Sequence, residues 1–261
     1  MRLALVDRQW LLAGGNWGEP ASQWRWDGLE LAVGRRECHR PVTELATILS
    51  RRVELARQGG WEVSSISCRF LYLYSGVPMA SLVACVSAIV EIAAQLGVRV
   101  VHVPGLVGEE QSEWSGWQNC LQTWLTVAAR HNVQLACEWL GEPPGCWDNQ
   151  PTSLAGFAYD VGNRQVLGGD VAGELRILAD RLLQIRLKDR IRSRPDQLRP
   201  LGEGCLRLTV LARWLQSISY QGWLVLDQPA VVCDKSTLQR LADHLRQVLL
   251  SAKSASSSLA A

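Results

Sequence analysis

Short runs of apolar and β-branched residues alternate with longer stretches in which apolar residues recur every three or four positions, and this alternation continues along almost the whole chain. It predicts βα units whose strands form a parallel sheet. Eight runs predict strands, at residues 2–7, 28–33, 61–67, 98–104, 133–139, 157–161, 182–188 and 223–227. The stretches between them carry helical stripes, such as Leu82, Val86 and Ile89, that would each cover part of the sheet.

Eight such units in 261 residues match the size of a compact (β/α)8 TIM barrel, which typically needs about 250 residues. An eight-stranded doubly wound sheet is the alternative, and periodicity alone does not separate the two. The first and fifth connections, residues 8–27 and 141–156, lack a clean helical stripe, and in a barrel such loops build the mouth of the pocket. We expect a single barrel domain over residues 1–250 and a disordered tail of small polar residues at 251–261.

The charge balance excludes several classes of partner. The 27 Lys and Arg residues stand against 25 Asp and Glu residues, for a net charge of +2, with both signs scattered along the sequence. Nucleic-acid binding relies on clustered basic residues, so we expect no nucleic-acid partner. No stretch approaches the roughly 20 apolar residues of a membrane span, which predicts a cytoplasmic protein without membrane contact. The 8 cysteines are then expected to be reduced.

Several otherwise apolar strands end in a charged or polar residue. These residues are Glu30, His102, Glu138, Asp160, Arg186, Lys188 and Asp227. In a parallel barrel the carboxyl ends of the strands converge on one pocket, so we expect the seven side chains to meet there. Asp7 and Asp189 are interpreted as helix caps. A hydrogen-bonded core histidine is the simpler interpretation of His102, with a nitrogen ligand for a metal ion or a contact to substrate as the alternatives.

Three carboxylates in one pocket repel one another and need a cation. A bound metal ion or a basic side chain can supply it. Arg186 and Lys188 are two positions apart on one strand and therefore point to the same face. The sequence thus predicts a deliberately charged pocket, and leaves the nature of its cation open.

The segments GLELAV, VQLACEWLGE, FAYDVGN, LQIRLKD, PLGEG and YQGWLVLDQ, in this order, resemble the xylose isomerase-like TIM-barrel superfamily of sugar phosphate isomerases and epimerases. The resemblance implies one divalent cation held by a Glu, an Asp, a His and a Glu on strands five to eight. Glu138 and Asp160 match the first two positions. Arg186 stands where the family has His, and Asp227 where it has Glu. Asn163 likewise replaces a His found in many members.

These departures leave two states of the site open. Arginine keeps its proton in proteins and is no metal ligand, whereas histidine can be one. In the first state, Mg²⁺ or Mn²⁺ is held by Glu138, Asp160, Asp227 and waters. In the second, the site is free of metal and the Arg186 guanidinium neutralises the acids.

The resemblance implies an isomerase or epimerase that abstracts a proton next to the carbonyl of a small sugar, sugar phosphate or related hydroxy-carbonyl compound. Glu138 and Asp227 are the expected acid/base pair, and Lys188 a catalytic cation. The expected substrate-binding residues are Glu30, His102, Arg186 and Glu203, the last in a loop that matches a substrate-side loop of the family. The alternative is a non-catalytic barrel that binds a polyol or acidic metabolite as a sensor or partner. Whether the chain forms a homodimer is left open.

Overall fold

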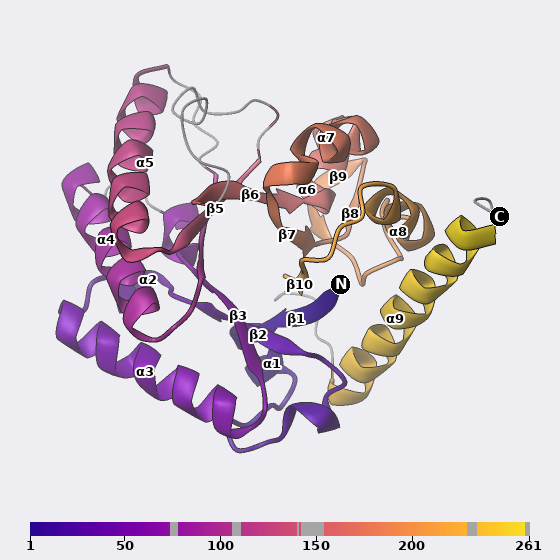
Figure 1. Cartoon of the computed structure of the whole chain (residues 1–261), viewed down its shortest axis with the longest axis horizontal. Helices are drawn as coiled ribbons and strands as arrows, with labels where there is room; N and C mark the ends of the chain where they lie inside the picture. Colours follow the sequence, from indigo (N-terminus) through magenta and orange to yellow (C-terminus); the bar gives the residue numbers. More distant parts are fainter. Residues whose placement is uncertain (74–77, 106–110, 140, 142–153, 229–233, 259–261) are drawn as a thin grey trace.

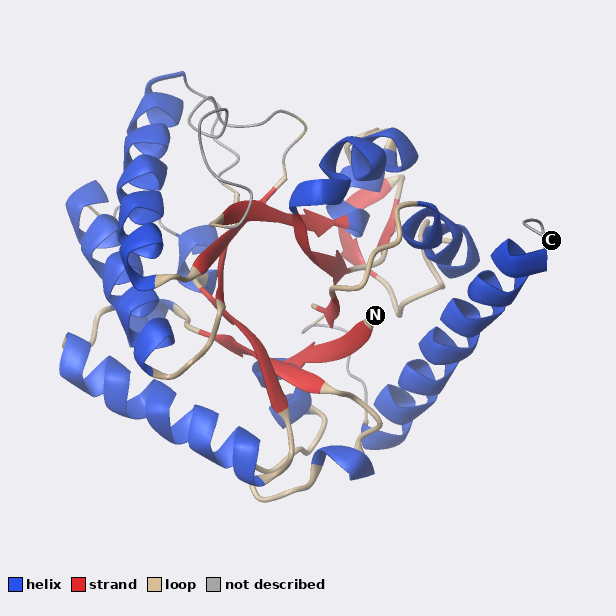
Figure 2. Ribbon diagram, in the orientation of Figure 1, coloured by secondary structure: helices blue, strands red, loops and turns tan. Residues whose placement is uncertain are grey.

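The computed structural model describes residues 1–73, 78–105, 111–139, 141, 154–228 and 234–258. Within these residues eight parallel strands close into a barrel, in the order β1-β10-β7-β6-β5-β4-β3-β2 (Figure 2). Their bounds are β1 Arg2–Val6, β2 Gly28–Ala32, β3 Glu62–Ser67, β4 Val100–Val103, β5 Gln134–Glu138, β6 Ala155–Asp160, β7 Leu182–Leu187 and β10 Trp223–Leu226. All eight predicted strands are confirmed, and the pairing of β1 with β10 excludes the open sheet.

Helices surround this ring of strands (Figure 1). Their bounds are α1 Asp7–Leu12, α2 Arg35–Cys38, α3 Val42–Gln58, α4 Met79–Gln95, α5 Gln111–His131, α6 Val161–Val166, α7 Val171–Leu178, α8 Leu208–Ser217 and α9 Lys235–Ser258. The predicted stripes are the buried faces: Leu82, Val86 and Ile89 of α4 are almost completely excluded from solvent. The outer ring therefore covers the apolar outer surface of the barrel, as the helical spacing predicts.

The first connection contains only the short helix α1 and a 3₁₀ turn at Ala21–Gln23, consistent with its lack of a clean stripe. Tryptophans of this connection belong to the hydrophobic core. Trp10 and Trp24 are fully buried, and the ring of Trp10 packs edge-to-face against those of Trp24 and Trp61, at centroid distances of 6.0 and 5.5 Å. Most of the fifth connection, residues 142–153, lies outside the described residues.

Two features differ from the expected pattern. The segment expected to be a disordered tail from residue 251 begins inside α9, which continues to Ser258. Alanine is the strongest helix former, and Ala252 is buried on the inner face of the helix, so the helix extends beyond the predicted boundary. A hairpin of β8 (Arg190–Ile191) and β9 (Arg194–Leu198) follows β7 and was not predicted. Among the described residues, no helix is long and apolar enough to cross a membrane.

Candidate functional site

An arginine lies at the centre of the barrel, bonded to two acids from other strands. Arg186 of β7 donates from Nη1 to Glu30 Oε2 of β2 at 2.8 Å, and from Nη2 to Asp227 Oδ2, just beyond β10, at 2.7 Å. All three side chains are fully buried. The strand register positions Arg186 for these contacts. Its backbone lies level with that of Asp160 in β6 on one side and that of Val225 in β10 on the other. The predicted convergence of strand-end charges is present.

Lys188, two residues after Arg186 along the chain, forms ion pairs with Asp160 and Asp227. Lys188 follows β7, and its Nζ lies 2.8 Å from Asp160 Oδ2 and 3.1 Å from Asp227 Oδ2. Arg69, which begins the 3₁₀ helix η2 (Arg69–Leu73) after β3, pairs with the other oxygen of Asp227. Asp227 therefore contacts three cations at once.

Arg69 is the member of this charged group that the sequence did not indicate. Its side chain is 18% exposed, whereas those of Arg186 and Asp227 are 0% exposed, so Arg69 is the most accessible cation of this group. The available signal was weak: an arginine two positions after the end of a strand, without a neighbouring acid in the sequence.

The electrostatics of Asp227 follow from these contacts. Burial by itself would raise the pKa of the Asp227 carboxyl, but Lys188, Arg186 and Arg69 hold that pKa well below its ordinary value of 3.8. The carboxylate therefore stays ionised at neutral pH and is a poor source of protons. This geometry argues against the expected role of Asp227 as half of an acid/base pair, and favours a role in anchoring the three cations.

His102 of β4 packs behind the arginine. Its Nδ1 lies 2.8 Å from Ser67 Oγ and 3.3 Å from Arg186 Nη1. Arginine can only donate, so Nδ1 is an acceptor and we assign the ring proton to Nε2. Burial, reinforced by the charge of Arg186, lowers the pKa of His102 well below 6.5, and the ring is neutral at pH 7. Nδ1 is therefore hydrogen-bonded, as expected for a core histidine, whereas Nε2 has no hydrogen-bond partner among the described residues.

Glu138, at the end of β5, lies in an adjoining set of contacts. Its Oε1 accepts from Asn163 Nδ2 at 2.9 Å and its Oε2 from the Gly105 amide at 3.3 Å. The same asparagine accepts from Arg190 Nε at 3.0 Å and donates its backbone amide to Asp160 Oδ1 at 2.9 Å. Asn163 therefore connects Glu138 to the Asp160–Lys188–Asp227 group.

A glycine makes this placement of Asn163 feasible. A Cβ added at Gly162, in the first turn of α6, would lie 2.5 Å from the backbone oxygen of Lys188. Only glycine lets the first turn of α6 approach the end of β7 this closely.

Glu203 lies apart from these contacts. It is exposed and lines a surface hollow of about 440 Å³ beside the β8–β9 hairpin, together with Arg192, Arg199 and Cys205. The structure therefore brings together the other seven predicted site residues, in two connected sets, and leaves Glu203 in a separate hollow.

Asp189, interpreted from sequence as a helix cap, instead organises this loop. Its fully buried carboxylate accepts four backbone amides: Arg190 at 2.9 Å, Gly202 at 2.8 Å, Gly204 at 2.9 Å and Leu206 at 2.9 Å. A Cβ at Gly204 would lie 2.2 Å from Asp189 Oδ1, so the loop can close on the carboxylate only with glycine there. Asp189 thus fixes the segment after Lys188 in place.

We expect the Asp189→Ala variant to lose about 2–3 kcal/mol of unfolding free energy, because buried amide donors would lose their acceptor. Urea unfolding measures the loss, and hydrogen exchange locates it: the amides of Gly202, Gly204 and Leu206 should exchange faster, while those of α3 should not change. Asp189→Asn keeps one acceptor oxygen and should show a smaller effect. Unchanged exchange at the three amides would contradict this role.

Asp7, the other residue interpreted as a cap, is buried at the end of β1. Its Oδ1 accepts the amides of Arg8 at 2.7 Å and Ala32 at 3.1 Å, and Arg52 Nη1 lies 3.6 Å from Oδ2. Burial raises the pKa of Asp7 from 3.8 to about 6, outweighing the opposing charge of Arg52. We therefore expect Asp7 to titrate near pH 6 in the folded protein.

This raised pKa predicts a pH dependence of stability. Because the pKa of Asp7 is higher in the folded state than in the unfolded state, the free energy of unfolding falls as the pH rises. The loss begins above pH about 4, where Asp7 ionises in the unfolded chain, and reaches about 3 kcal/mol above pH about 6. Asp7→Asn removes this cost. Urea unfolding from pH 4 to 8 should show the variant gaining stability relative to the wild type as the pH rises to about 6. A constant difference over that range would show that Asp7 titrates normally.

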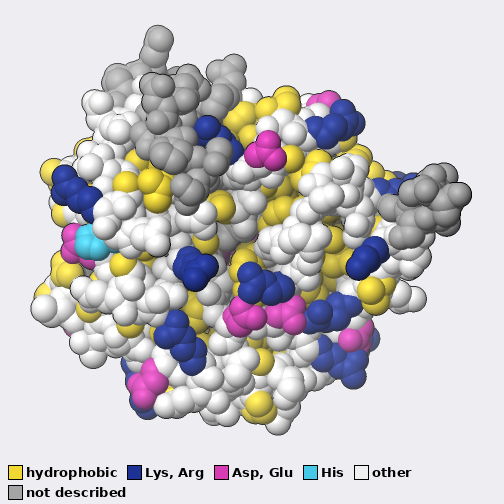
Figure 3. Space-filling model, viewed as in Figure 1, with side chains coloured by type: hydrophobic (Ala, Val, Ile, Leu, Met, Phe, Trp, Pro, Cys, Tyr) yellow, Lys and Arg dark blue, Asp and Glu magenta, His cyan; other side chains and the backbone are white. Residues whose placement is uncertain are grey.

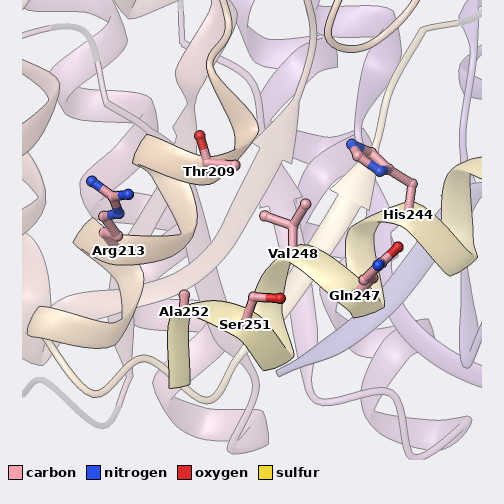
Figure 4. A pocket seen from close by; sticks show the side chains of 7 residues that line it. All are labelled: Thr209, Arg213, His244, Gln247, Val248, Ser251 and Ala252. Atoms are coloured by element: carbon pink, nitrogen blue, oxygen red, sulfur yellow. The ribbon is translucent and has the colours of Figure 1, made fainter. Parts of the chain in front are cut away.

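The surface outside the barrel offers a further groove, of about 310 Å³, between α8 and α9 (Figure 4). It is lined by Thr209 and Arg213 of α8 and by His244 and Val248 of α9, and by none of the predicted site residues. On the face shown in Figure 3, basic and acidic side chains lie next to one another. The groove contains none of the predicted site residues, and the mixed surface charges of the described residues form no patch of one sign on this face. The barrel interior therefore remains the candidate site.

A closed ring of eight parallel strands, surrounded by helices, defines a (β/α)8-barrel protein. The candidate site lies at the carboxyl ends of the strands, where such barrels bind ligands. Residues 19–249 match the family model described as "Xylose isomerase-like TIM barrel", and the chain belongs to that family. The resemblance read from the sequence is thereby confirmed.

Individual relatives agree with this assignment. A relative from Escherichia coli (strain K12), whose name marks it as a provisional L-ribulose-5-phosphate 3-epimerase (SgbU), is 28% identical over 158 residues, or 54% of this chain. The match spans 55% of that relative, about half its length. A D-tagatose 3-epimerase-like protein superposes with a TM-score of 0.70 at 16% identity, over 96% of this chain and 99% of that one. The protein IolI, solved with a zinc atom, gives a TM-score of 0.63 at 13% identity, over 97% and 98% of the two chains. At these identities the two structures establish the shared fold.

The residues at the implied metal position do not fit a metal ion. Arg186 stands where the nitrogen ligand would be, and Asp160 and Asp227 both bind the Lys188 ammonium. Glu138, the third acid, accepts from Asn163 and Gly105. Among the described residues, no group of three or more His, Cys, Asp and Glu side chains is arranged to hold a metal ion.

Proposed function

We propose that this protein is an isomerase or epimerase of a small sugar, sugar phosphate or related hydroxy-carbonyl compound. The family membership and the epimerase names of its relatives support this class of reaction. The observation that carries the proposal is the position of Glu138, because a carboxylate whose two oxygens accept from fixed amide donors lies next to a group that contains Lys188.

Glu138 is the proposed base. Its two oxygens accept from Asn163 Nδ2 and the Gly105 amide, and these two hydrogen bonds fix the orientation of the carboxylate that would take the proton. The carboxylate takes the proton from the carbon next to the carbonyl, and the electron pair of that bond moves onto the carbonyl oxygen to give an enediolate. Return of the proton to the former carbonyl carbon yields an isomer, as the hydroxyl proton on the oxygen of the first carbon passes to the oxygen of the former carbonyl. Protonation of the first carbon on its opposite face by a solvent molecule, with Glu138 giving its proton back to solvent, yields an epimer.

Lys188 is the proposed cation for the developing oxyanion. Asp160 and Asp227 hold its ammonium from two sides, and a positioned cation stabilises negative charge that appears on the substrate oxygen. Arg69, the more exposed cation on Asp227, is the proposed contact for an anionic or hydroxyl group of the substrate. Arg186, Glu30 and His102 form the buried support for Asp227 in this scheme, and Glu203 is a substrate contact only for a compound long enough to reach its separate hollow.

One observation favours a non-catalytic barrel that binds a polyol or acidic metabolite. Glu30, Arg186 and Asp227 are fully buried and hydrogen-bonded to one another, which suits a static support more than a centre that must contact substrate.

Solvent exchange separates the two functions. Ketoses, ketose phosphates and related hydroxy-carbonyl compounds are incubated with the protein in D₂O, and deuterium at the carbon next to the carbonyl is measured by proton NMR. An isomerase or epimerase incorporates deuterium, because the abstracted proton exchanges with solvent. A compound that binds by calorimetry without incorporating deuterium would support the sensor, and would refute the enzyme for that compound.

A further inference from the structure

The implied metal position lies among side chains that already carry positive charge. Lys188 Nζ bridges one oxygen of Asp160 and one of Asp227, at 2.8 and 3.1 Å. A divalent ion bound by these two carboxylates would have to displace the ammonium or lie beside it, and both charges are positive. Coulomb repulsion between charges a few ångströms apart in a buried site opposes the second arrangement.

Arg186 also occupies the implied metal position, where it contacts Glu30 and Asp227. Its two terminal nitrogens are held at 2.8 and 2.7 Å by Glu30 and Asp227. Rotating the guanidinium away to admit an ion would leave Glu30 buried without its charge partner, which is costly. The guanidinium itself cannot serve as a ligand, because it does not lose its proton.

The charges of the site are already close to balance. Its four carboxylates are Glu30, Glu138, Asp160 and Asp227, and the ion pairs described for them, within the described residues, involve three cations, Arg69, Arg186 and Lys188. Three positive charges against four negative ones leave little for a divalent ion to neutralise. In addition, the Glu138 oxygens accept from Asn163 and Gly105, so this acid has its hydrogen bonds without a metal.

We propose that the site of this protein excludes divalent metal ions, and that the Arg186 guanidinium and the Lys188 ammonium replace the ion as the fixed positive charge. The inference rests on the proposed function only for what that charge does during a reaction. Exclusion of the ion concerns binding, and it is measured without substrate or turnover.

The experiment titrates the purified 261-residue protein with Mn²⁺, following the free ion by electron paramagnetic resonance, and with Zn²⁺, by equilibrium dialysis and elemental analysis. The wild type should bind neither ion at the site. Arg186→His supplies a neutral nitrogen donor, and combined with Lys188→Ala it removes both competing charges, so the double variant should gain one equivalent of bound ion. Arg51→His, on the exposed face of α3, is the matched control and should gain none.

One equivalent of ion retained by the wild type would overturn the proposal. A folded double variant that binds no ion would also overturn it, because the two cations would then not be what excludes the metal. Circular dichroism establishes that each variant is folded. If Arg186→His does not fold, Lys188→Met alone serves as the second variant, with a gain in Mn²⁺ affinity expected over the wild type. The proposed function is tested separately, by the deuterium exchange assay, so its failure is distinguishable from failure of metal exclusion. If the site excludes metal ions, a chelator should leave the exchange rate of the wild type unchanged.

Discussion

Replacing Arg186 by methionine is expected to lower the free energy of unfolding by about 3–5 kcal/mol, the usual cost of removing one partner from a buried ion pair. Glu30 and Asp227 would remain fully buried. Asp227 would keep Lys188 and Arg69, so most of the loss should fall on Glu30, whose closest remaining donor is Ser65 Oγ at 2.9 Å. Urea unfolding followed by tryptophan fluorescence and circular dichroism measures the change.

Two further variants make this result specific. Arg51→Met removes an exposed partner of Glu54, and should cost less than about 1 kcal/mol, as exposed ion pairs do. Adding Glu30→Gln to Arg186→Met removes the unpaired charge and should recover part of the lost stability. A loss below about 1 kcal/mol for Arg186→Met alone would show that the guanidinium is not the buried partner of these acids.

Replacing Glu138 by glutamine is expected to slow deuterium incorporation into a substrate by about 10²–10⁴-fold, the usual contribution of a general base. The amide has nearly the same shape but cannot accept the proton. Its NH₂ group would also face a donor, either Asn163 Nδ2 or the Gly105 amide, and Asn163 cannot flip without turning its own NH₂ group towards Arg190. A modest loss of stability should therefore accompany the loss of exchange.

Glu54→Gln removes the same charge from the exposed face of α3, and exchange should continue at the wild-type rate. Asp227→Asn is the informative comparison. If Asp227 anchors Lys188 and Arg69 without carrying a proton, its replacement should lower the rate without shifting the pH profile of the exchange. Exchange by Glu138→Gln at the wild-type rate would exclude Glu138 as the base, and would leave the reaction class to be tested with another acceptor.

The alternation of apolar and polar positions was sufficient to place the eight strands, because each buried strand and each helical stripe reports its own period locally. It also located the strand-end charges Glu30, Glu138, Asp160, Arg186 and Asp227, since a charge at the end of an apolar strand is visible in the sequence. The β8–β9 hairpin was missed, because β8 has only two residues and the hairpin carries several charges, so it shows no period of its own.

The roles of individual charges could not be read in the same way. Asp7 and Asp189 look alike in the sequence, each following a strand, but one is a buried carboxyl with a raised pKa and the other anchors four amides. Arg69 gave almost no signal, because its partner Asp227 is 158 positions away. The loop motif predicts that Glu203 belongs to the site, but the residue lines a separate hollow.

The sequence by itself determined the class of fold, the family and the set of charged residues at the strand ends. Only the tertiary structure decided which charge meets which: the closed barrel places Arg186 between Glu30 and Asp227, and Lys188 between Asp160 and Asp227. The physical reason is that hydrophobic periodicity is a local property of the chain. The energy of a buried charge, in contrast, depends on partners a few ångströms away in space, and these are set by the strand register and the closure of the sheet.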